Sequence, residues 1–298
     1  MNNINNDEFD LKKTLKTGPD NSFYNVQSIL HLSANQITKL LFYTGVAPHQ
    51  VILFSLLVGV GSAFLITSQS LSLRILGGAF LFYKNVLDKV DGSLARAKGL
   101  DSRRGRFYDS LSDFFVNLAV FSSIAYYLSL KYNNYWIYPV VYLAMIISMI
   151  QCSYFIYYQV SFIKQTGKQT VNRLIEKVTE QDLVNQDRFT IFLQKIFQII
   201  YGWQDYLVFR LDRLLRDNLT KLYPENDLNK YWFNDKKFLT IASILSIGTH
   251  MVLIAVFSII NLIEVYLFVN LILLNLLLIY SIIYHYKSVK NELKGSYI

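Results

Sequence analysis

Two pairs of acidic residues lie close together in a stretch of the chain that is otherwise strongly apolar. Asp88 and Asp91 are three residues apart and Asp109 and Asp113 are four residues apart, so each pair shares one face of a helix. Ionisable groups inside or at the ends of apolar segments are costly unless they are compensated, which makes these four acids candidates for function. A tight turn over residues 99–105 would bring the two faces together.

Four converging carboxylates cannot all stay ionised without cations between them. Oxygen ligands with no His or Cys nearby suit a hard divalent ion, so the pattern predicts a Mg²⁺ or Mn²⁺ site. The alternative is that the acids form a salt-bridge network at the membrane surface with basic neighbours, namely Lys84, Lys89, Arg96 and the arginines of 103–106. Spacing alone leaves both interpretations open.

The elements that must position these acids are long apolar segments. The chain has 298 residues, of which 53% are hydrophobic and only 17% charged, whereas a soluble domain carries about a quarter charged residues. A single Cys excludes a disulfide framework. Runs of about 20 apolar residues predict an all-α integral membrane protein with six transmembrane helices, at residues 48–67, 71–91, 107–130, 135–160, 237–260 and 263–285.

Positive charge is distributed unevenly between the connections. Of the 29 Lys and Arg residues, only Arg74 and Lys131 lie beside the short connections after the first and third spans, and none lies between the last two spans. The others lie in the N-terminal segment, residues 84–106, residues 164–237 and the C-terminal tail. By the positive-inside rule, both termini, the two long connections and the acidic site are expected to be cytoplasmic.

The net charge of +8 is explained by this topology and by attraction to anionic membrane lipids. Nucleic acid is not an expected partner, because the chain has neither a soluble basic face nor a binding motif for it.

The pattern divides the chain into four regions. We expect a disordered cytoplasmic tail at 1–22, an amphipathic juxtamembrane helix with transmembrane helices 1–4 at 23–163, a cytoplasmic amphipathic helical insertion at 164–236, and transmembrane helices 5–6 with a cytoplasmic tail at 237–298. The insertion is expected to lie on the membrane or over the mouth of the site. A helical linker packed on its own bundle is the alternative.

The residues around the four acids form one longer pattern. It is Asp88-x-x-Asp91-Gly92-x-x-Ala95-Arg96-x8-Gly105-x-x-x-Asp109-x-x-x-Asp113, with eight fixed positions over 26 residues. This pattern resembles the signature of the CDP-alcohol phosphatidyltransferase family at every fixed position. The resemblance covers about residues 35–165 by motif and, by hydropathy only, residues 237–285.

The resemblance implies a reaction and roles for the acids. A CDP-linked donor would be cleaved at its pyrophosphate, and the substituted phosphate would pass to an alcohol acceptor with release of CMP. Asp88, Asp91 and Asp109 would hold two Mg²⁺ or Mn²⁺ ions that clamp the reacting oxygens. Asp113 would border the metal site as a further ligand and act as general base. Exchanging the roles of Asp109 and Asp113 would give the same sequence pattern.

The same resemblance implies contacts with the donor by Gly92, Ala95, Arg96, Ser102 and Gly105. Gly92 and Ala95 leave room for the nucleotide, and Arg96 offers a planar charged group to phosphate. Gly105 is expected to allow close packing of the third span on the second. Helix packing alone remains the alternative for both glycines and Ala95. A homodimer is implied only by the habit of the family.

Two further features bear on the substrate. The sequence between Asp109 and Asp113 is Ser-Leu-Ser, which is similar to prokaryotic lipid synthases, whereas eukaryotic choline- and ethanolaminephosphotransferases usually have His-Gly-Cys there. This favours a CDP-lipid donor such as CDP-diacylglycerol and a prokaryotic inner membrane, with the choline/ethanolamine type as the alternative. The start of the first span departs from the family, since His49 and Ile52 stand where Asn and Thr are common.

A different class of protein would also use buried acids. A polytopic carrier could use the four aspartates as a cation site, but such carriers often show paired repeats, and the sequence has no such internal symmetry.

Overall fold

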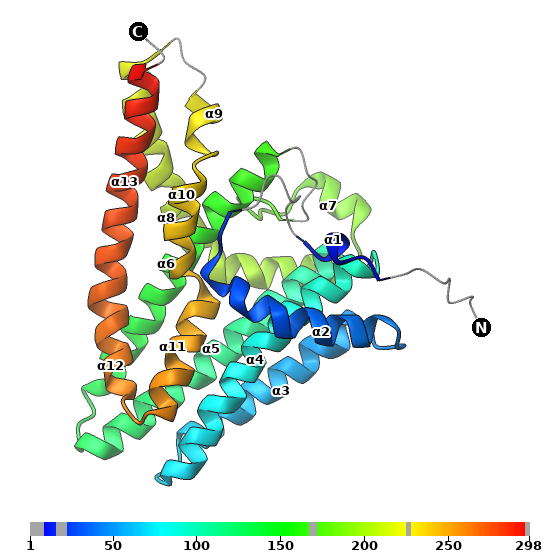
Figure 1. The fold of residues 1–298 in the computed structure, drawn as a ribbon, viewed down its shortest axis with the longest axis vertical. Coiled ribbons are helices and arrows are strands. Elements are labelled where there is room, and N and C mark those ends of the chain that lie inside the picture. Colours follow the sequence, from blue (N-terminus) through cyan, green and yellow to red (C-terminus); the bar gives the residue numbers. More distant parts are fainter. Residues whose placement is uncertain (1–8, 16–22, 167–171, 225–227, 296–298) are drawn as a thin grey trace.

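The computed structural model describes residues 9–15, 23–166, 172–224 and 228–295, and over these ranges it is built from helices without any strand. Four long helices follow one another from the first third of the chain, and Figure 1 shows them as a slanted bundle. They are α3 (Pro48–Ile66), α4 (Leu71–Ala97), α5 (Arg103–Tyr132) and α6 (Ile137–Gln165).

The C-terminal part adds two segments along this bundle. The first is α10 (Lys236–Ala242), a 3₁₀ turn (Ser243–Leu245) and α11 (Ile247–Ile259). The second is α12 (Ile263–Phe268), a π-helical turn (Val269–Leu273) and α13 (Leu274–Gly295).

Four segments are long and apolar enough to cross a membrane, namely α3, α5, α6 and the continuous stretch Ile263–Gly295. The segment Lys236–Leu245 with Ile247–Ile259, bent by 45°, is a fifth candidate if it counts as one span. The prediction of six spans is therefore not confirmed. The difference arises at α4, which has 27 residues and is long enough to span a membrane. It carries Arg74, Lys84 and Asp88 within its first 18 positions, and these charges exclude it from the candidate spans.

The three short connections lie at one end of the bundle, the lower end in Figure 1, while the α4–α5 turn and the C-terminus lie away from it. The two basic residues at this end are held by neighbours. Arg74 donates to the Ser68 and Gln69 carbonyl oxygens at 2.9 and 2.8 Å and to Asn261 Oδ1 at 2.9 Å. Lys131 Nζ lies 2.9 Å from Glu264 Oε1.

Helix α4 packs against α3 and α11 on one side and exposes apolar residues such as Leu76 and Phe80 on the other. Two glycines permit this close approach. A Cβ atom at Gly77 would lie 3.0 Å from Ile66 Cγ1 of α3, and one at Gly78 would lie 2.7 Å from the Ala255 carbonyl oxygen of α11. Small residues at such contacts let helix backbones pack closely within a membrane, so these glycines hold one side of α4 against its neighbouring helices.

The N-terminal segment lies across this bundle. A 3₁₀ turn (Val26–Leu30) leads into α2 (His31–Phe42), which corresponds to the predicted juxtamembrane helix and buries Ala34 and Thr38 toward α4. Part of the predicted disordered tail is ordered, because α1 (Leu11–Thr14) is capped by Asp10 and packs on α4. Residues 1–8 and 16–22 of that tail lie outside the described residues.

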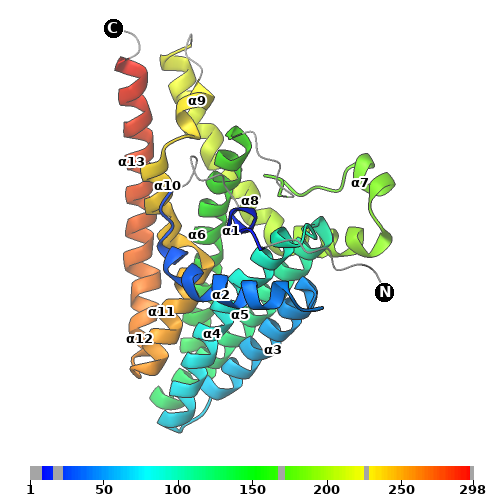
Figure 2. The ribbon, with the colours of Figure 1, turned by 45° about the vertical axis from the view of Figure 1, so that its right-hand side comes forward.

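Between α6 and α10 lie α7 (Glu180–Asn185), α8 (Arg188–Leu222) and α9 (Leu228–Trp232). Helix α7 extends away from the bundle in Figure 2. Asp187 caps α8 by accepting hydrogen bonds from the backbone N–H groups of Phe189 and Thr190, both at 3.0 Å. Helix α8 packs against α5 and α6 and is not among the candidate spans found in the described residues.

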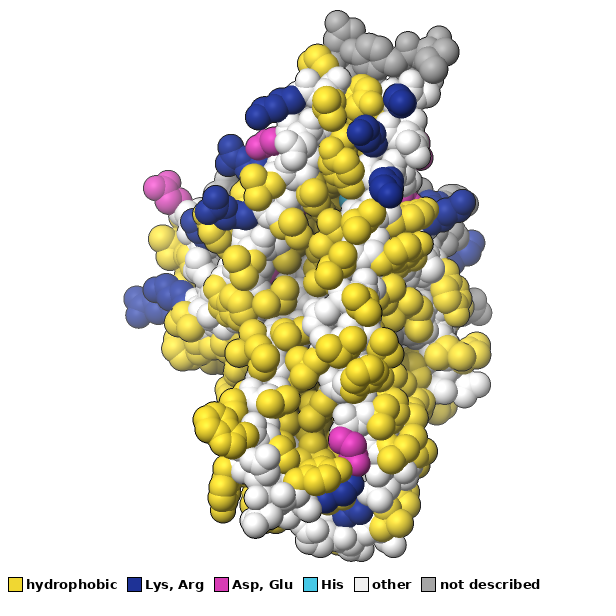
Figure 3. Space-filling model, turned by 90° about the vertical axis from the view of Figure 1, so that its left-hand side faces the viewer, with side chains coloured by type: hydrophobic (Ala, Val, Ile, Leu, Met, Phe, Trp, Pro, Cys, Tyr) yellow, Lys and Arg dark blue, Asp and Glu magenta, His cyan; other side chains and the backbone are white. Residues whose placement is uncertain are grey.

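One face of the molecule is largely apolar over its lower and middle parts, with basic side chains toward its upper end (Figure 3). Exposed apolar residues along the C-terminal span include Leu276, Ile279 and Ile283. A broad exposed apolar surface of this kind is expected for a helix bundle that faces lipid.

Candidate active site

The site is built on the hairpin of α4 and α5. Helix α4 ends in a turn in which Gly99 has a φ of +64°, and the Leu100 N–H donates to the Ala95 carbonyl oxygen at 2.8 Å. This is the helix termination that glycine favours, because it has no Cβ to oppose a positive φ. Helix α5 begins directly afterwards, with Ser102 Oγ accepting a hydrogen bond from the Gly105 N–H at 3.1 Å.

This hairpin brings three of the four predicted acids together. Asp88, Asp91 and Asp109 each offer a carboxylate oxygen, and these oxygens lie within 4.8 Å of one another. Asp91 is buried, and its Oδ2 has no hydrogen-bond partner among the described residues. A buried carboxylate oxygen that faces two further carboxylates needs positive charge close by. The three acids therefore fit a hard divalent cation bound through oxygen ligands.

The fourth acid, Asp113, is held differently. The buried Lys84 of α4 reaches across to α5, where its ammonium group is ion-paired with Asp113, and it also lies 3.2 Å from Asp88 Oδ1. Lys89 Nζ lies 4.0 Å from the other oxygen of Asp88. The salt-bridge network that the sequence offered as an alternative is therefore present in part, and Asp88 belongs both to it and to the group of three carboxylates that could hold a metal ion.

The remaining members of the predicted network have other partners. Arg96 Nε donates to the Thr14 carbonyl oxygen of α1 at 2.7 Å. A Cβ atom at Gly92 would lie 3.3 Å from Arg96 Nη1, so Gly92 leaves room for this guanidinium group. Arg103 and Arg106 form ion pairs with Glu176, a residue of the insertion.

The other predicted donor contacts lie around the hairpin turn. Ala95 is half-buried in the last turn of α4, and Ser102 is exposed at the start of α5. Among the described residues, only Ser102 Oγ, at 3.3 Å, would lie within 4 Å of a Cβ atom at Gly105. The packing role expected for Gly105 is therefore not observed, because α5 does not approach α4 closely at this point and the space beside Gly105 is open.

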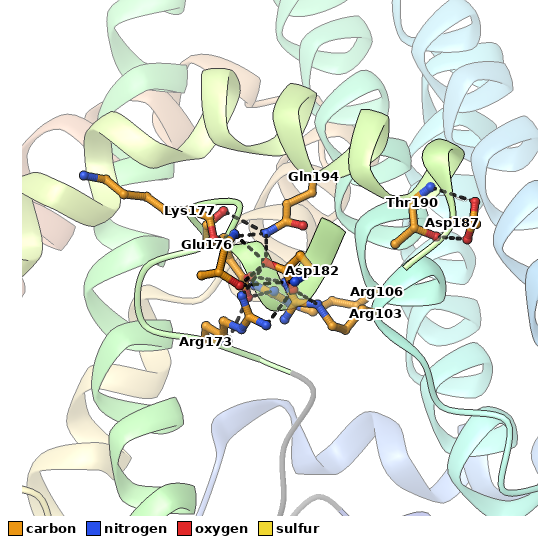
Figure 4. A network of polar contacts seen from close by, with 10 residues as sticks. Arg103, Arg106, Arg173, Glu176, Lys177, Asp182, Asp187, Thr190 and Gln194 are labelled. Carbon is orange, nitrogen blue, oxygen red and sulfur yellow. Dashed lines mark hydrogen bonds and ion pairs between the residues drawn. The ribbon is translucent and has the colours of Figure 1, made fainter. Parts of the chain in front are cut away.

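A second polar cluster joins the insertion to the start of α5 (Figure 4). Glu176 is buried and accepts from two arginines of the first turn of α5, with Arg103 Nη2 at 2.8 Å from Oε2 and Arg106 bound to Oε1. The Arg173 N–H also donates to Glu176 Oε1 at 2.8 Å. The carboxylate of Glu176 is therefore fully used in holding the insertion against α5.

Asp182 extends this cluster into α7 and α8. It accepts two hydrogen bonds from the Arg173 guanidinium group, both at 2.7 Å, and one from Gln194 Nε2 of α8 at 3.3 Å. The hydrogen bonds from Arg173 hold the pKa of Asp182 well below its usual range. Gln194 also donates to the Glu176 carbonyl oxygen at 3.2 Å, so one amide group links both acidic residues to α8.

Helix α8 lies directly beside the acidic hairpin. The Tyr201 hydroxyl donates to the carbonyl oxygen of Ser110, the residue that follows Asp109, at 2.9 Å. One turn further along α8, burial raises the pKa of the Asp205 carboxyl to about 6, although the nearby Arg106 opposes this shift. The insertion thus places a phenol group and a carboxyl group next to the first turns of α5.

Sequence reasoning missed the partners that the insertion supplies. Glu176 is 73 residues from Arg103 and Tyr201 is 91 residues from Ser110, and neither lies in a motif. The pairing of Lys84 with Asp88 could be predicted locally, because Lys84 precedes Asp88 by four residues on the same helix face. Its pairing with Asp113 on the next helix depends on the hairpin geometry, which spacing along one helix does not specify.

A family model described as CDP-alcohol phosphatidyltransferase matches residues 45–209, which is more than half of the chain. The match begins just before α3 and ends within α8, so it includes the acidic hairpin and continues through much of the insertion. A comparison with curated proteins finds no match.

Proposed function

Since the chain belongs to the CDP-alcohol phosphatidyltransferase family, we propose that it transfers a phosphatidyl group from a CDP-linked lipid, such as CDP-diacylglycerol, to an alcohol acceptor and releases CMP. Membership makes the chain a transferase of substituted phosphate groups. The lipid nature of the donor is the proposed step, and it is supported by the Ser-Leu-Ser sequence between Asp109 and Asp113. The product would be a phospholipid.

The observation that carries the proposal is the group of three carboxylates with one unsatisfied buried oxygen. We assign Asp88, Asp91 and Asp109 as ligands of two Mg²⁺ or Mn²⁺ ions, with Asp113 at the border of that site. Divalent ions bound there would neutralise the charge of the donor pyrophosphate and of the leaving phosphate.

Residues of the protein would accept the proton and bind the donor. Asp113 accepts the proton of the acceptor hydroxyl group, and Lys84 holds the Asp113 carboxylate in place between α4 and α5. Arg96 lies over Gly92 at the end of α4, where its guanidinium group can bind a donor phosphate. Ala95, Ser102 and Gly105 border the same turn, and the open space at Gly105 leaves room for the donor.

We further propose that the acidic hairpin faces the cytoplasm of a prokaryotic cell, in the inner membrane. The support is the distribution of Lys and Arg, which avoids the three short connections at the opposite end of the bundle apart from the paired Arg74 and Lys131. With this orientation, α4 completes the crossing between α3 and α5 as a sixth span, which packs on α3 and α11.

The test is release of CMP by the purified protein in lipid vesicles with Mg²⁺ or Mn²⁺. CDP-diacylglycerol should yield CMP when inositol phosphate, glycerol phosphate or serine is present, and mass spectrometry of the lipids should show which acceptor was used. CMP formed only from CDP-choline or CDP-ethanolamine with diacylglycerol would replace the proposed donor by the soluble type. No CMP from any donor, with cation uptake into the vesicles instead, would indicate a carrier.

A further inference from the structure

The side of α8 that faces away from the bundle carries a row of exposed apolar and aromatic residues. Ile199 is 77% exposed and Leu214 is 61% exposed, and Trp203, Tyr206 and Leu207 lie between them in the sequence. At 3.6 residues per turn these five positions fall on one face of the helix. A contiguous row of exposed apolar residues indicates a surface that contacts a membrane, a ligand or another protein.

The same face carries positive charge. Lys195, Arg210 and Arg213 are exposed along it, and Asp217, paired with Arg213 at 3.7 Å, is the acid close to them. The buried side of α8 instead contacts α6. There Gln204 of α8 accepts a hydrogen bond from the Ser153 hydroxyl group of α6 at 3.0 Å. The buried side of α8 thus combines apolar residues such as Phe197 and Val208 with hydrogen-bonded polar groups, and its exposed side is both apolar and basic.

Two hydrogen bonds fix the depth of this helix along the bundle. Tyr201 binds Ser110 of α5, and Gln204 binds Ser153 of α6. Measured along these helices at 1.5 Å per residue, the contacts lie about 33 Å from Tyr132 and about 24 Å from Ile137, at the other end of the bundle. The hydrocarbon core of a bilayer is about 30 Å thick, so the middle of α8 lies at the opposite membrane surface.

Aromatic residues support the same placement. Tyr135 and Trp136, in the connection between α5 and α6, are each 80% exposed, and Trp203 and Tyr206 lie at the far end of the same two helices. Trp and Tyr concentrate at both interfaces of a membrane. The two aromatic pairs therefore lie where the two headgroup layers would be.

We propose that the exposed face of α8 lies in the headgroup layer on the side of the acidic hairpin and binds anionic phospholipid. The apolar row fits the boundary between acyl chains and headgroups, and the flanking cations fit lipid phosphate groups. A second copy of the chain fits this face poorly, because a symmetric contact would bring the cations of both copies together.

The test uses the single cysteine, Cys152, which is buried. Ile199→Cys and Leu207→Cys are each labelled with a nitroxide, and the protein is reconstituted in vesicles of phosphatidylcholine with phosphatidylglycerol. Collisions of the label with oxygen should exceed those with a water-soluble nickel complex at both positions. Glu180→Cys is the control, because Glu180 is exposed on α7, which extends away from the bundle, and there the order should be reversed.

Charge dependence is tested with Lys195→Gln, Arg210→Gln and Arg213→Gln combined, in the Leu207→Cys background. With the native cations, adding phosphatidylglycerol to phosphatidylcholine vesicles should increase collisions of the label with oxygen relative to those with the nickel complex. The combined variant should lose that increase. A label that collides mainly with the nickel complex at positions 199 and 207 would overturn the proposal. Dipolar broadening between labels would indicate a second copy instead and would overturn it equally.

Discussion

Lys84 of α4 and Asp113 of α5 form an ion pair that joins the two helices of the acidic hairpin. The ammonium group also lies 3.2 Å from Asp88, so one lysine compensates an acid on each helix. Because Lys84 is buried, its removal would take the nearest positive charge away from two poorly hydrated carboxylates.

We expect Lys84→Met to destabilise the folded protein by about 3–5 kcal/mol, the usual cost of removing one partner of a buried ion pair. Lys89→Met is the control, since Lys89 is 4.0 Å from Asp88 and more exposed, and it should cost under about 1 kcal/mol. Denaturant unfolding in detergent measures both values. Equal effects of the two substitutions would contradict the bridging role of Lys84.

Asp113→Asn should reduce CMP release by about 10²–10⁴-fold, the range expected when a general base is removed. The protein should remain folded, because the amide is nearly isosteric with the carboxylate. The control is Asp101→Asn, which changes an exposed acid in the α4–α5 turn and should leave the rate unchanged. A rate within a few-fold of the native value for Asp113→Asn would refute the assignment of the base.

Asp91→Asn should separate metal binding from folding. The substitution removes one of three mutually repelling carboxylates, so without divalent ions the variant should be at least as stable as the native protein. Saturating Mg²⁺ or Mn²⁺ should stabilise the native protein by about 3 kcal/mol at a hundred times the dissociation constant and the variant far less. Thermal unfolding with and without chelator measures this, and an equal response to Mg²⁺ in both proteins would exclude Asp91 as a ligand.

Glu176→Gln should loosen the insertion from the start of α5, because two arginines would lose their shared carboxylate. We expect a loss of about 3–5 kcal/mol and faster proteolysis between α6 and α8. Arg104→Gln is the control, since it removes a charge from the same turn, where the guanidinium group lies 4.9 Å from the centre of the Phe189 ring and is exposed. If Glu176 acts through the arginines, adding Arg106→Gln to Glu176→Gln should cost less than the two single changes summed.

The pH dependence of stability should contain a contribution from Asp205. Burial raises the pKa of Asp205 to about 6, whereas the unfolded value is about 3.9. The folded state therefore binds this proton more tightly, so stability falls by about 3 kcal/mol as the pH rises from about 4 to about 6, and then levels off. Asp205→Asn should remove that fall and be more stable than the native protein at neutral pH.

Denaturant unfolding over a series of pH values measures this difference. Asp217→Asn is the control, because Asp217 is exposed on the same helix, and its curve should follow that of the native protein. A curve for Asp205→Asn that runs parallel to the native one would show that the Asp205 carboxyl is not perturbed by burial.

Local patterns predicted much of the fold and the acidic site. The apolar run at 48–67 became α3, and the three- and four-residue spacing of the acids correctly placed Asp88, Asp91 and Asp109 together. Both results depend on interactions within one helix or across one short turn, which sequence spacing describes well.

The remaining features depend on contacts between distant segments. Hydropathy cannot show that α4 buries Arg74 and Lys84 while it exposes apolar residues such as Leu76 and Phe80, because it averages over both sides of the helix. The bend of 45° near Ser246 lies where Ser243, Ser246 and Gly248 interrupt an apolar run, and hydropathy averaged over a span does not register this interruption. Glu176 and Asp182 were missed because their arginine partners include residues of α5, which the insertion meets only in the folded chain.

The tight turn at Gly99 also has a consequence for biosynthesis. Lys84 and the four aspartates all come from 30 consecutive residues, whereas the helix that lies beside them ends at Leu222. At a synthesis rate of about 5–20 residues per second, the end of α8 follows Asp113 by roughly 5–20 s. The hairpin with its lysine and four aspartates is therefore synthesised as one unit before the last helices have been translated.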